Sequence, residues 1–127
     1  MSIYNKISCV LIALAIALGA FGAHAWQAIL EGHRSTFDTG HLYHLTQAIG
    51  LLAYIAIVGN RFQRRHRMAF SFILIGIILF SGSLYLLSFP DIFGGTWRTV
   101  LGPVTPVGGL LMIAGWIMAA FSIKVNN

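Results

Sequence analysis

Long apolar stretches alternate with short polar ones along this chain. No Asp, Glu, Lys or Arg falls within residues 7–30, 41–59, 68–89 or 103–123. Each run is close to the roughly 20 residues that a helix needs to cross a hydrocarbon core of ~30 Å. The pattern therefore predicts four transmembrane helices with these bounds, in a single domain spanning residues 1–127. The fold class that we expect is an all-α membrane four-helix bundle.

All three prolines lie in the second half of the chain. Pro90 has no N–H and disfavours helix in the residue before it, so it is expected to end the third helix. Thr105 followed by Pro106 is typical of an N-cap with proline at the first helical position, which predicts the start of the fourth helix.

The first apolar run has a second interpretation. Lys6, the apolar stretch and Ala23-His24-Ala25 together resemble a secretory signal with its cleavage site. The run is longer than the apolar region of such signals, and we expect an uncleaved membrane helix.

The composition agrees with a membrane protein. Only 9% of the 127 residues are charged, against about 25% in soluble domains. The single cysteine, Cys9, excludes an internal disulfide framework and CxxC motifs. The basic residues flank apolar runs instead of lining a polar face, so a nucleic-acid partner is not expected.

The distribution of charge predicts the orientation in the membrane. With four helices, six of the eight basic residues fall on the side of the termini, and only Arg34 and Arg98 fall on the other. Both termini are therefore expected in the cytoplasm, in the inner membrane of a cell. The six are Lys6, Arg61, Arg64, Arg65, Arg67 and Lys124. The central arginines could also bind anionic lipid headgroups.

Small residues recur at helical spacing in the first and fourth helices. Ala15, Gly19 and Ala23 are four apart, and Gly108 and Gly115 lie on the fourth helix. Small residues let helix backbones approach closely in lipid. We expect these two helices to be central, packed within the bundle or against a second copy or a larger membrane complex.

Polar side chains concentrate in the outward halves of the predicted helices. His24, His44, Ser81, Tyr85 and Thr105 are expected at similar depth, and polar groups in hydrocarbon usually face the bundle interior or water. They predict an outward-facing polar pocket for a ligand. The structural alternative is a buried hydrogen-bond network that only orients the helices.

Metal or haem ligation by His24 and His44 is a further alternative, although no cysteine or helical glutamate accompanies them. His41-x-x-His44 also has metal-compatible spacing, but His41 is close enough to a helix end to reach the headgroups. The sequence holds no nucleophile elbow, phosphate loop or dinucleotide fingerprint.

Several motifs resemble one family. They are Gly19–Ala25 (GAFGAHA), Tyr43–His44, Phe80–Tyr85 (FSGSLY), Leu101–Gly109 (LGPVTPVGG) and Gly115–Trp116. In this order they resemble the domain of unknown function 423 family, the YgdD/YwdK-like small inner-membrane proteins. The resemblance implies a four-helix inner-membrane protein and no particular activity or cofactor. His41, Thr46 and Gln47 fall outside the family's pattern.

Three functions follow as hypotheses. The first is a non-enzymatic binding protein or subunit of a membrane complex, with a small ligand, lipid or quinone-like headgroup in the pocket. The second is a small transporter subunit, although no acidic residue lies inside a predicted helix. The third is a haem- or metal-binding membrane protein.

Overall fold

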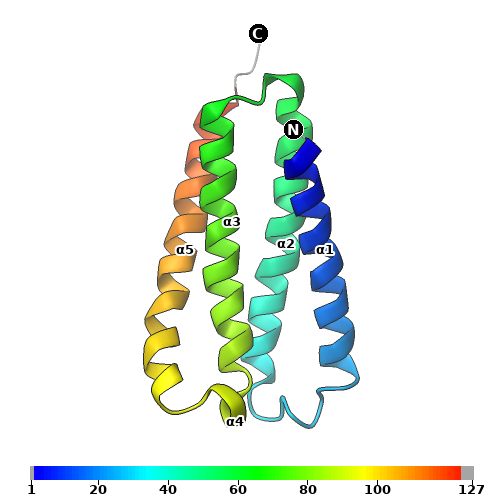
Figure 1. The fold of residues 1–127 in the computed structure, drawn as a ribbon, viewed down its shortest axis with the longest axis vertical. Helices are drawn as coiled ribbons and strands as arrows, with labels where there is room; N and C mark the ends of the chain where they lie inside the picture. Colours follow the sequence, from blue (N-terminus) through cyan, green and yellow to red (C-terminus); the bar gives the residue numbers. More distant parts are fainter. Residues whose placement is uncertain (1, 124–127) are drawn as a thin grey trace.

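Four long helices run side by side in the computed structural model, which describes residues 2–123 (Figure 1). The elements are α1 (Ser2–Ala23), α2 (Arg34–Val58), the 3-10 turn η1 (Gly59–Arg61), α3 (Arg64–Leu87), the short α4 (Pro90–Phe93) and α5 (Thr96–Ser122). The start of α1, the turn η1 and the end of α5 lie at one end of the bundle, the termini end. The turn at 24–33 and α4 lie at the opposite loop end. Lys124, counted in the charge pattern above, lies outside the described residues.

The outer surface of the bundle is apolar. All four long helices are long and apolar enough to cross a membrane. Large side chains such as Ile16, Leu110 and Phe121 point outward, and Phe121 is 84% exposed. Helices that are apolar on every side are typical of membrane spans. The predicted all-α membrane four-helix bundle is confirmed.

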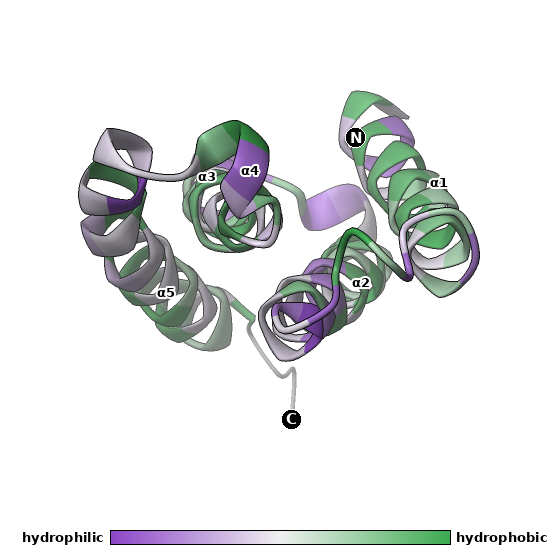
Figure 2. Cartoon of the chain, turned by 90° about the horizontal axis from the view of Figure 1, so that it is seen from below, coloured by the Kyte–Doolittle hydropathy of each residue, from purple (hydrophilic) through white to green (hydrophobic). Residues whose placement is uncertain are grey.

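The helices do not form a closed square. α3 packs along both α2 and α5, whereas α1 packs mainly against α2. Viewed along the bundle, α1 lies beside α2 and away from α5 (Figure 2). The expectation that the first and fourth helices are central is therefore wrong. The two central helices are α2 and α3, because each of them packs against two other long helices.

That core fills the space between α2, α3 and α5. Its buried members are Leu51, Ile55, Phe70, Ile73, Ile77 and Met112. At the termini end the ring of Tyr4 packs on Phe62 and Phe70 with centroids 4.7 and 5.0 Å away, which fastens the start of α1 to this core.

Glycines bring α3 and α5 into backbone contact. A Cβ on Gly108 would collide with the backbone nitrogen of Phe80, and one on Gly76 would lie 2.8 Å from the Gly108 carbonyl. A Cβ on Gly115 would lie 2.9 Å from the nitrogen of Ile73. Close approach at small residues is how helices associate in lipid. The expectation for Gly108 and Gly115 agrees with this interface.

The first two helices have different bounds from those predicted. α1 ends at Ala23 instead of residue 30, because Trp26 folds back and stacks on Phe21 with ring centroids 5.2 Å apart. α2 begins at Arg34 instead of residue 41. An ion pair between Arg34 and Asp38 at i, i+4 supports this additional turn.

The last two helices also begin earlier. α3 starts at Arg64 and ends at Leu87, with Gln63 and His66 forming a capping box. α5 starts at Thr96, after Gly95, whose φ of 63° suits glycine. Thr105 is therefore not an N-cap, because Pro103 and Pro106 lie inside the helix. Prolines are tolerated within membrane helices where other groups re-satisfy the backbone.

Two glycines of α5 provide a matched test of this packing. We expect Gly108→Ala to destabilise the bundle by about 1–3 kcal/mol, since the new methyl group has no room against the α3 backbone. Gly102→Ala, where no atom lies within 4 Å of the added carbon, should be neutral or stabilising by up to about 1 kcal/mol. Thermal unfolding in detergent measures both, and equal melting temperatures would contradict the packing described here.

Candidate functional site

A histidine and a tyrosine join α2 to α3 in the half of the bundle nearest the loop end. His44 Nδ1 and the Tyr85 hydroxyl share a hydrogen bond of 2.9 Å. His44 is 5% exposed, and its Nε2 is buried without a partner among the described residues. The hydroxyl of Ser81 is also buried and has no hydrogen-bond partner among the described residues. The structure thus places three of the predicted pocket residues on facing helices.

Thr105 belongs to a separate contact. Its hydroxyl lies 2.6 Å from that of Ser83, and the Ser83 hydroxyl lies 2.9 Å from the Phe80 carbonyl. Either hydroxyl can donate in this bond, which joins α3 to α5, and the Thr105 hydroxyl also lies 3.5 Å from the Leu101 carbonyl. Sequence reasoning chose Ser81 as the α3 residue of the site and did not choose Ser83.

His24 is not brought to this group. It lies just beyond the end of α1 and is exposed. Gly19 of α1 lies against the ring of His41 of α2. This contact gives a common reference point on the two helices. His24 lies five residues after Gly19, toward the loop end, and His44 lies three residues after His41, toward the termini end. At 1.5 Å per residue the two histidines are about 12 Å apart along the bundle, too far to share one metal ion.

No group of three or more metal-ligating side chains occurs in the part of the chain that the structure describes. The predicted cavity among all five residues is also not what the geometry shows. Three cavities among residues 2–123 are lined by other side chains, and two of these cavities are described below. His44 bonds Tyr85 between α2 and α3, and Thr105 bonds Ser83 between α3 and α5.

The glycines of the first motif fit two rings of α2. The imidazole of His41 covers Gly19, where a Cβ would lie 2.8 Å from Nε2, and the same Nε2 bonds the Ala15 carbonyl at 2.9 Å. The ring of Phe37 covers Gly22 in the same way. His41 is thus a helix-joining residue, not one that reaches the headgroups. The third small residue, Ala23, is half-buried at the end of α1.

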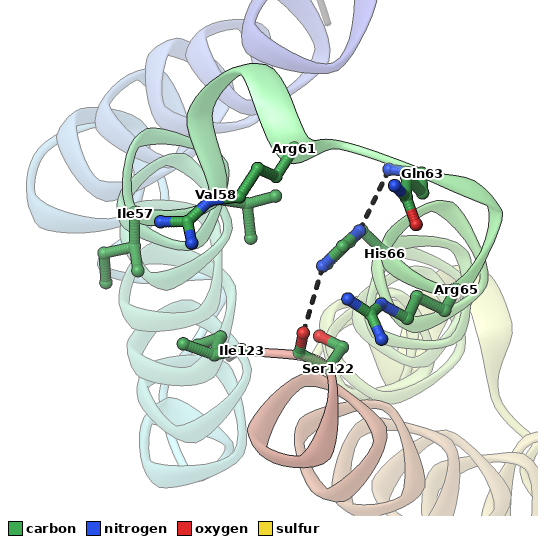
Figure 3. A pocket seen from close by; sticks show the side chains of 8 residues that line it. All are labelled: Ile57, Val58, Arg61, Gln63, Arg65, His66, Ser122 and Ile123. Atoms are coloured by element: carbon green, nitrogen blue, oxygen red, sulfur yellow. Dashed lines mark hydrogen bonds between the residues drawn. The ribbon is translucent and has the colours of Figure 1, made fainter. Parts of the chain in front are cut away.

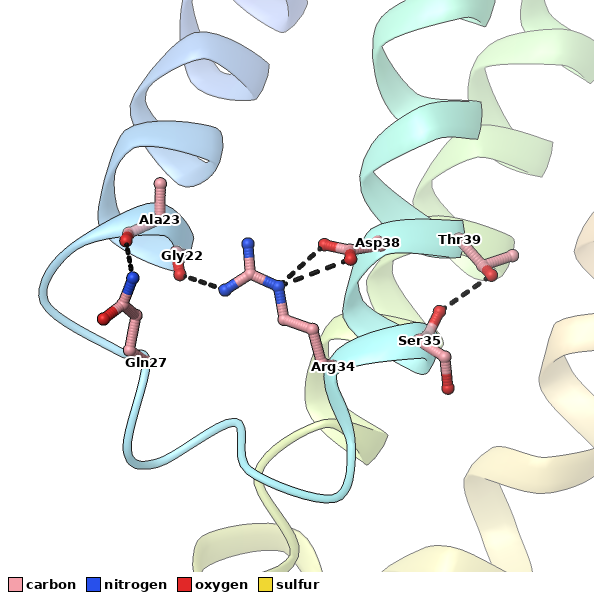
Figure 4. Close-up of polar contacts among 7 residues, drawn as sticks. All are labelled: Gly22, Ala23, Gln27, Arg34, Ser35, Asp38 and Thr39. Atoms are coloured by element: carbon pink, nitrogen blue, oxygen red, sulfur yellow. Dashed lines mark hydrogen bonds and ion pairs between the residues drawn. The ribbon is translucent and has the colours of Figure 1, made fainter.

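Arg34 closes the loop end of this interface. Its Nη1 donates to the Gly22 carbonyl, one of the last carbonyls of α1, which have no partner inside the helix (Figure 4). Its Nε lies 3.2 Å from a carboxylate oxygen of Asp38. Asp38 was expected in a loop and lies in the exposed start of α2, paired with this arginine.

A groove lies open on the outer surface between α2, α3 and α5. Its volume is about 480 Å³, within the range of ligand pockets. It is lined by Tyr43, Gln47, Phe80, Gly109, Met112, Ile113, Trp116 and Ile117. The helix-to-helix gap at this point follows from the close pairing of α5 with α3, which leaves α5 at a distance from α2.

One polar pair lies in this apolar groove. The indole Nε1–H of Trp116 donates to the side-chain oxygen of Gln47, and the indole packs over Gly50. Because indole nitrogen is only a donor, the Gln47 oxygen must face it, and the amide NH₂ points elsewhere. That NH₂ has no hydrogen-bond partner among residues 2–123. Gln47 lies one residue past the midpoint of α2.

The fold defines a class: a small α-helical membrane protein with four long apolar helices. The family model described as "Protein of unknown function (DUF423)" matches residues 18–109. The chain belongs to this family, as its motifs indicated.

Named relatives agree with the family. A UPF0382 membrane protein of Haemophilus influenzae is 42% identical over 107 residues, 84% of this chain and 81% of the relative. The UPF0382 membrane protein YwdK of Bacillus subtilis is 34% identical over 93% of both chains. A UPF0382 membrane protein of Schizosaccharomyces pombe is 32% identical over 81% of this chain and 86% of its own length. No solved structure matches the chain.

The bond between His44 and Tyr85 can be tested with a neighbouring tyrosine as control. Tyr85→Phe removes a hydroxyl that His44 needs, and we expect it to lower stability by about 0.6–2 kcal/mol. Tyr43→Phe removes an α2 hydroxyl with no bond of this kind and should change stability little. The measurement is thermal unfolding in detergent, and an equal effect of both changes would show that the bond contributes nothing.

Proposed function

We propose that this protein is a non-enzymatic binding protein of the inner membrane, and that the groove between α2, α3 and α5 holds a quinone-type molecule dissolved in the bilayer. The observation that carries the proposal is the free amide NH₂ of Gln47 at the midpoint of a membrane helix. A polar group left without a partner in hydrocarbon is costly. A ligand with a hydrogen-bond acceptor would remove that cost.

The depth of Gln47 favours a particular ligand chemistry. The ester carbonyls of phospholipids lie in the interfacial region outside the hydrocarbon core. A quinone carries its carbonyl groups on a ring that dissolves in the core itself. The walls match such a ring, because Tyr43, Phe80 and Trp116 supply aromatic faces and Met112 an adaptable apolar one. The groove opens sideways to lipid, so the ligand can enter from the bilayer.

The buried polar bonds have a supporting role in this proposal. Tyr43 and Phe80 of the groove are the chain neighbours of His44 and Ser81. The His44–Tyr85 bond would fix the rotation of α2 against α3, and with it the direction in which Tyr43 and Phe80 point. The outward-facing polar pocket of the sequence hypothesis is thereby replaced by a laterally open groove beside a polar network.

The orientation that we propose places both termini in the cytoplasm. The four arginines of the central turn, Arg61, Arg64, Arg65 and Arg67, all lie at the termini end, whereas the loop end has only Arg34 and Arg98 among the described basic residues. A bias of this kind sets the topology of membrane proteins.

Reporter fusions test the orientation directly. Reporters placed after Asn127 or after Asn60 are expected to be active as cytoplasmic fusions. Reporters placed at Gly32 or Gly95, in the two loop-end connections, are expected to report the opposite side. A loop-end reporter with cytoplasmic activity would overturn the orientation.

Tryptophan fluorescence tests the groove. A Trp26→Phe, Trp97→Phe protein retains only Trp116, and decylubiquinone should quench it saturably, because the indole lies in the groove. Adding Gln47→Leu should weaken the affinity about 3- to 30-fold, the value of one membrane hydrogen bond. Gln27→Leu, the same change on the exposed loop-end turn, should leave the affinity unchanged.

A second single-tryptophan protein controls for quinone that merely partitions into the detergent. It retains Trp26, which packs on Phe37 and Phe89 at the loop end, and should show only non-saturable quenching. Gly109→Leu should fill the groove and abolish saturation, since ordinary contact with Phe80 leaves space at Gly109. Equal quenching of both tryptophans would contradict the proposal. So would the finding that the protein is a dimer that Gly109→Leu dissociates, with no effect of quinone, because the groove would then hold a second copy of the chain.

A further inference from the structure

A second cavity lies at the termini end, where α2, η1, α3 and α5 meet (Figure 3). Its volume is about 320 Å³. Arg61 reaches it from η1 and Arg65 from the first turn of α3, and the two guanidinium groups face it from different sides. Ile57 and Ile123 form an apolar wall. The cavity is thus cationic on one part of its lining and apolar on another.

The inner wall of this cavity is already hydrogen-bonded. The Gln63 N–H donates to His66 Nδ1 at 2.9 Å, so the imidazole proton is on Nε2, which donates to the Ser122 carbonyl at 3.3 Å. The Tyr54 hydroxyl lies 2.7 Å from the Ser122 hydroxyl. His66 and Ser122 are almost fully buried. These bonds hold the end of α5 against α2 and α3, and the side chains of Arg61 and Arg65 take no part in them.

No acidic side chain is near enough to neutralise these arginines. The three acids of the chain are Glu31 in the loop-end turn, Asp38 at the start of α2 and Asp91 in α4. The one ion pair among the described residues joins Arg34 to Asp38. Two like charges that share a cavity repel one another, and an anion between them would remove that repulsion. The start of α3 adds the positive end of a helix dipole.

The other arginines of the central turn do not line the cavity. Arg64 and Arg67 lie on the same turn of α3 as Arg65 but are not among the residues that line the cavity. As a topology signal all four arginines are equivalent, because only their side of the membrane matters. For binding in the cavity they are not equivalent, because only Arg61 and Arg65 line it. Variants of the two pairs can therefore separate binding from topology.

We propose that Arg61 and Arg65 bind a phosphate group in this cavity, with the apolar wall of Ile57 and Ile123 accommodating the adjoining part of an anionic lipid. Guanidinium groups bind phosphate oxygens through paired, charge-assisted hydrogen bonds. The site is independent of the groove, since its residues are different and it lies at the end of the bundle. The phosphate can come from a lipid headgroup or from a soluble phosphate, and the experiment distinguishes them.

The test compares two matched pairs of charge-conserving variants. Arg61→Lys with Arg65→Lys keeps the charge and the topology signal but loses the planar fork of donors. Arg64→Lys with Arg67→Lys makes the same change outside the cavity. Native mass spectrometry in a neutral detergent measures binding of dioleoylphosphatidylglycerol, with dioleoylphosphatidylcholine as the zwitterionic comparison. We expect weaker phosphatidylglycerol binding in the first pair only, and a preference for phosphatidylglycerol in the wild-type protein.

Removal of the charges should enlarge the effect. Arg61→Gln with Arg65→Gln is expected to weaken phosphatidylglycerol binding about tenfold or more, the value of hydrogen bonds to a charged group. A second experiment uses inorganic phosphate. It measures whether phosphate protects Arg61 and Arg65 from modification by phenylglyoxal. Protection by phosphate without lipid binding would support the phosphate site with a soluble source. The proposal would be overturned if phosphatidylglycerol binding fell equally in both variant pairs. It would also be overturned if the binding of neither phosphatidylglycerol nor phosphate depended on Arg61 and Arg65.

Discussion

The rest of the bundle depends on the backbone contact between α3 and α5. Gly76, Gly108 and Gly115 let these helices touch without intervening side chains, where lipid offers no hydrophobic force to bring helices together. Because α5 is drawn onto α3, it stands away from α2 near the middle of the bundle, and the gap becomes the groove. At the termini end α5 is close enough to both α2 and α3 for Tyr54 of α2 and His66 of α3 to bond Ser122. One interface therefore determines where both cavities lie.

Much of this architecture could be predicted from the apolar runs, because the cost of charge in lipid is a local property of the sequence. The helix ends could not. Residues 34–40 are mostly polar and lie outside the predicted second helix, but in the structure they are helical, with Arg34 paired to Asp38 and Phe37 packed on Gly22. Pro103 and Pro106 suggested a helix start, and the helix passes through both. In each case the helix extends beyond the boundary that the local sequence suggested.

The candidate site was predictable in part for the same reason. Burial cost correctly selected His44, Tyr85 and Thr105 as residues that need partners, since that cost depends on residue type and depth. The identity of the partners depends on rotation of each helix about its axis, which the sequence does not show. Thr105 meets Ser83, and His24 follows the end of α1 out of the bundle. Gln47 falls outside the family's motifs, and its bond to Trp116, 69 positions away on another helix, could not be inferred from the sequence.

The order of the helices in space has a consequence for biosynthesis. Each extensive interface joins helices that are neighbours along the chain: α1 with α2, α2 with α3, and α3 with α5. Such a topology has low contact order, so every new helix can dock on the one made just before it as the chain leaves the ribosome. No long helix needs a helix made much later in synthesis to form its main interface. A chain of this size can then assemble vectorially, with the bonds from Gln47 and Tyr54 to α5 formed last.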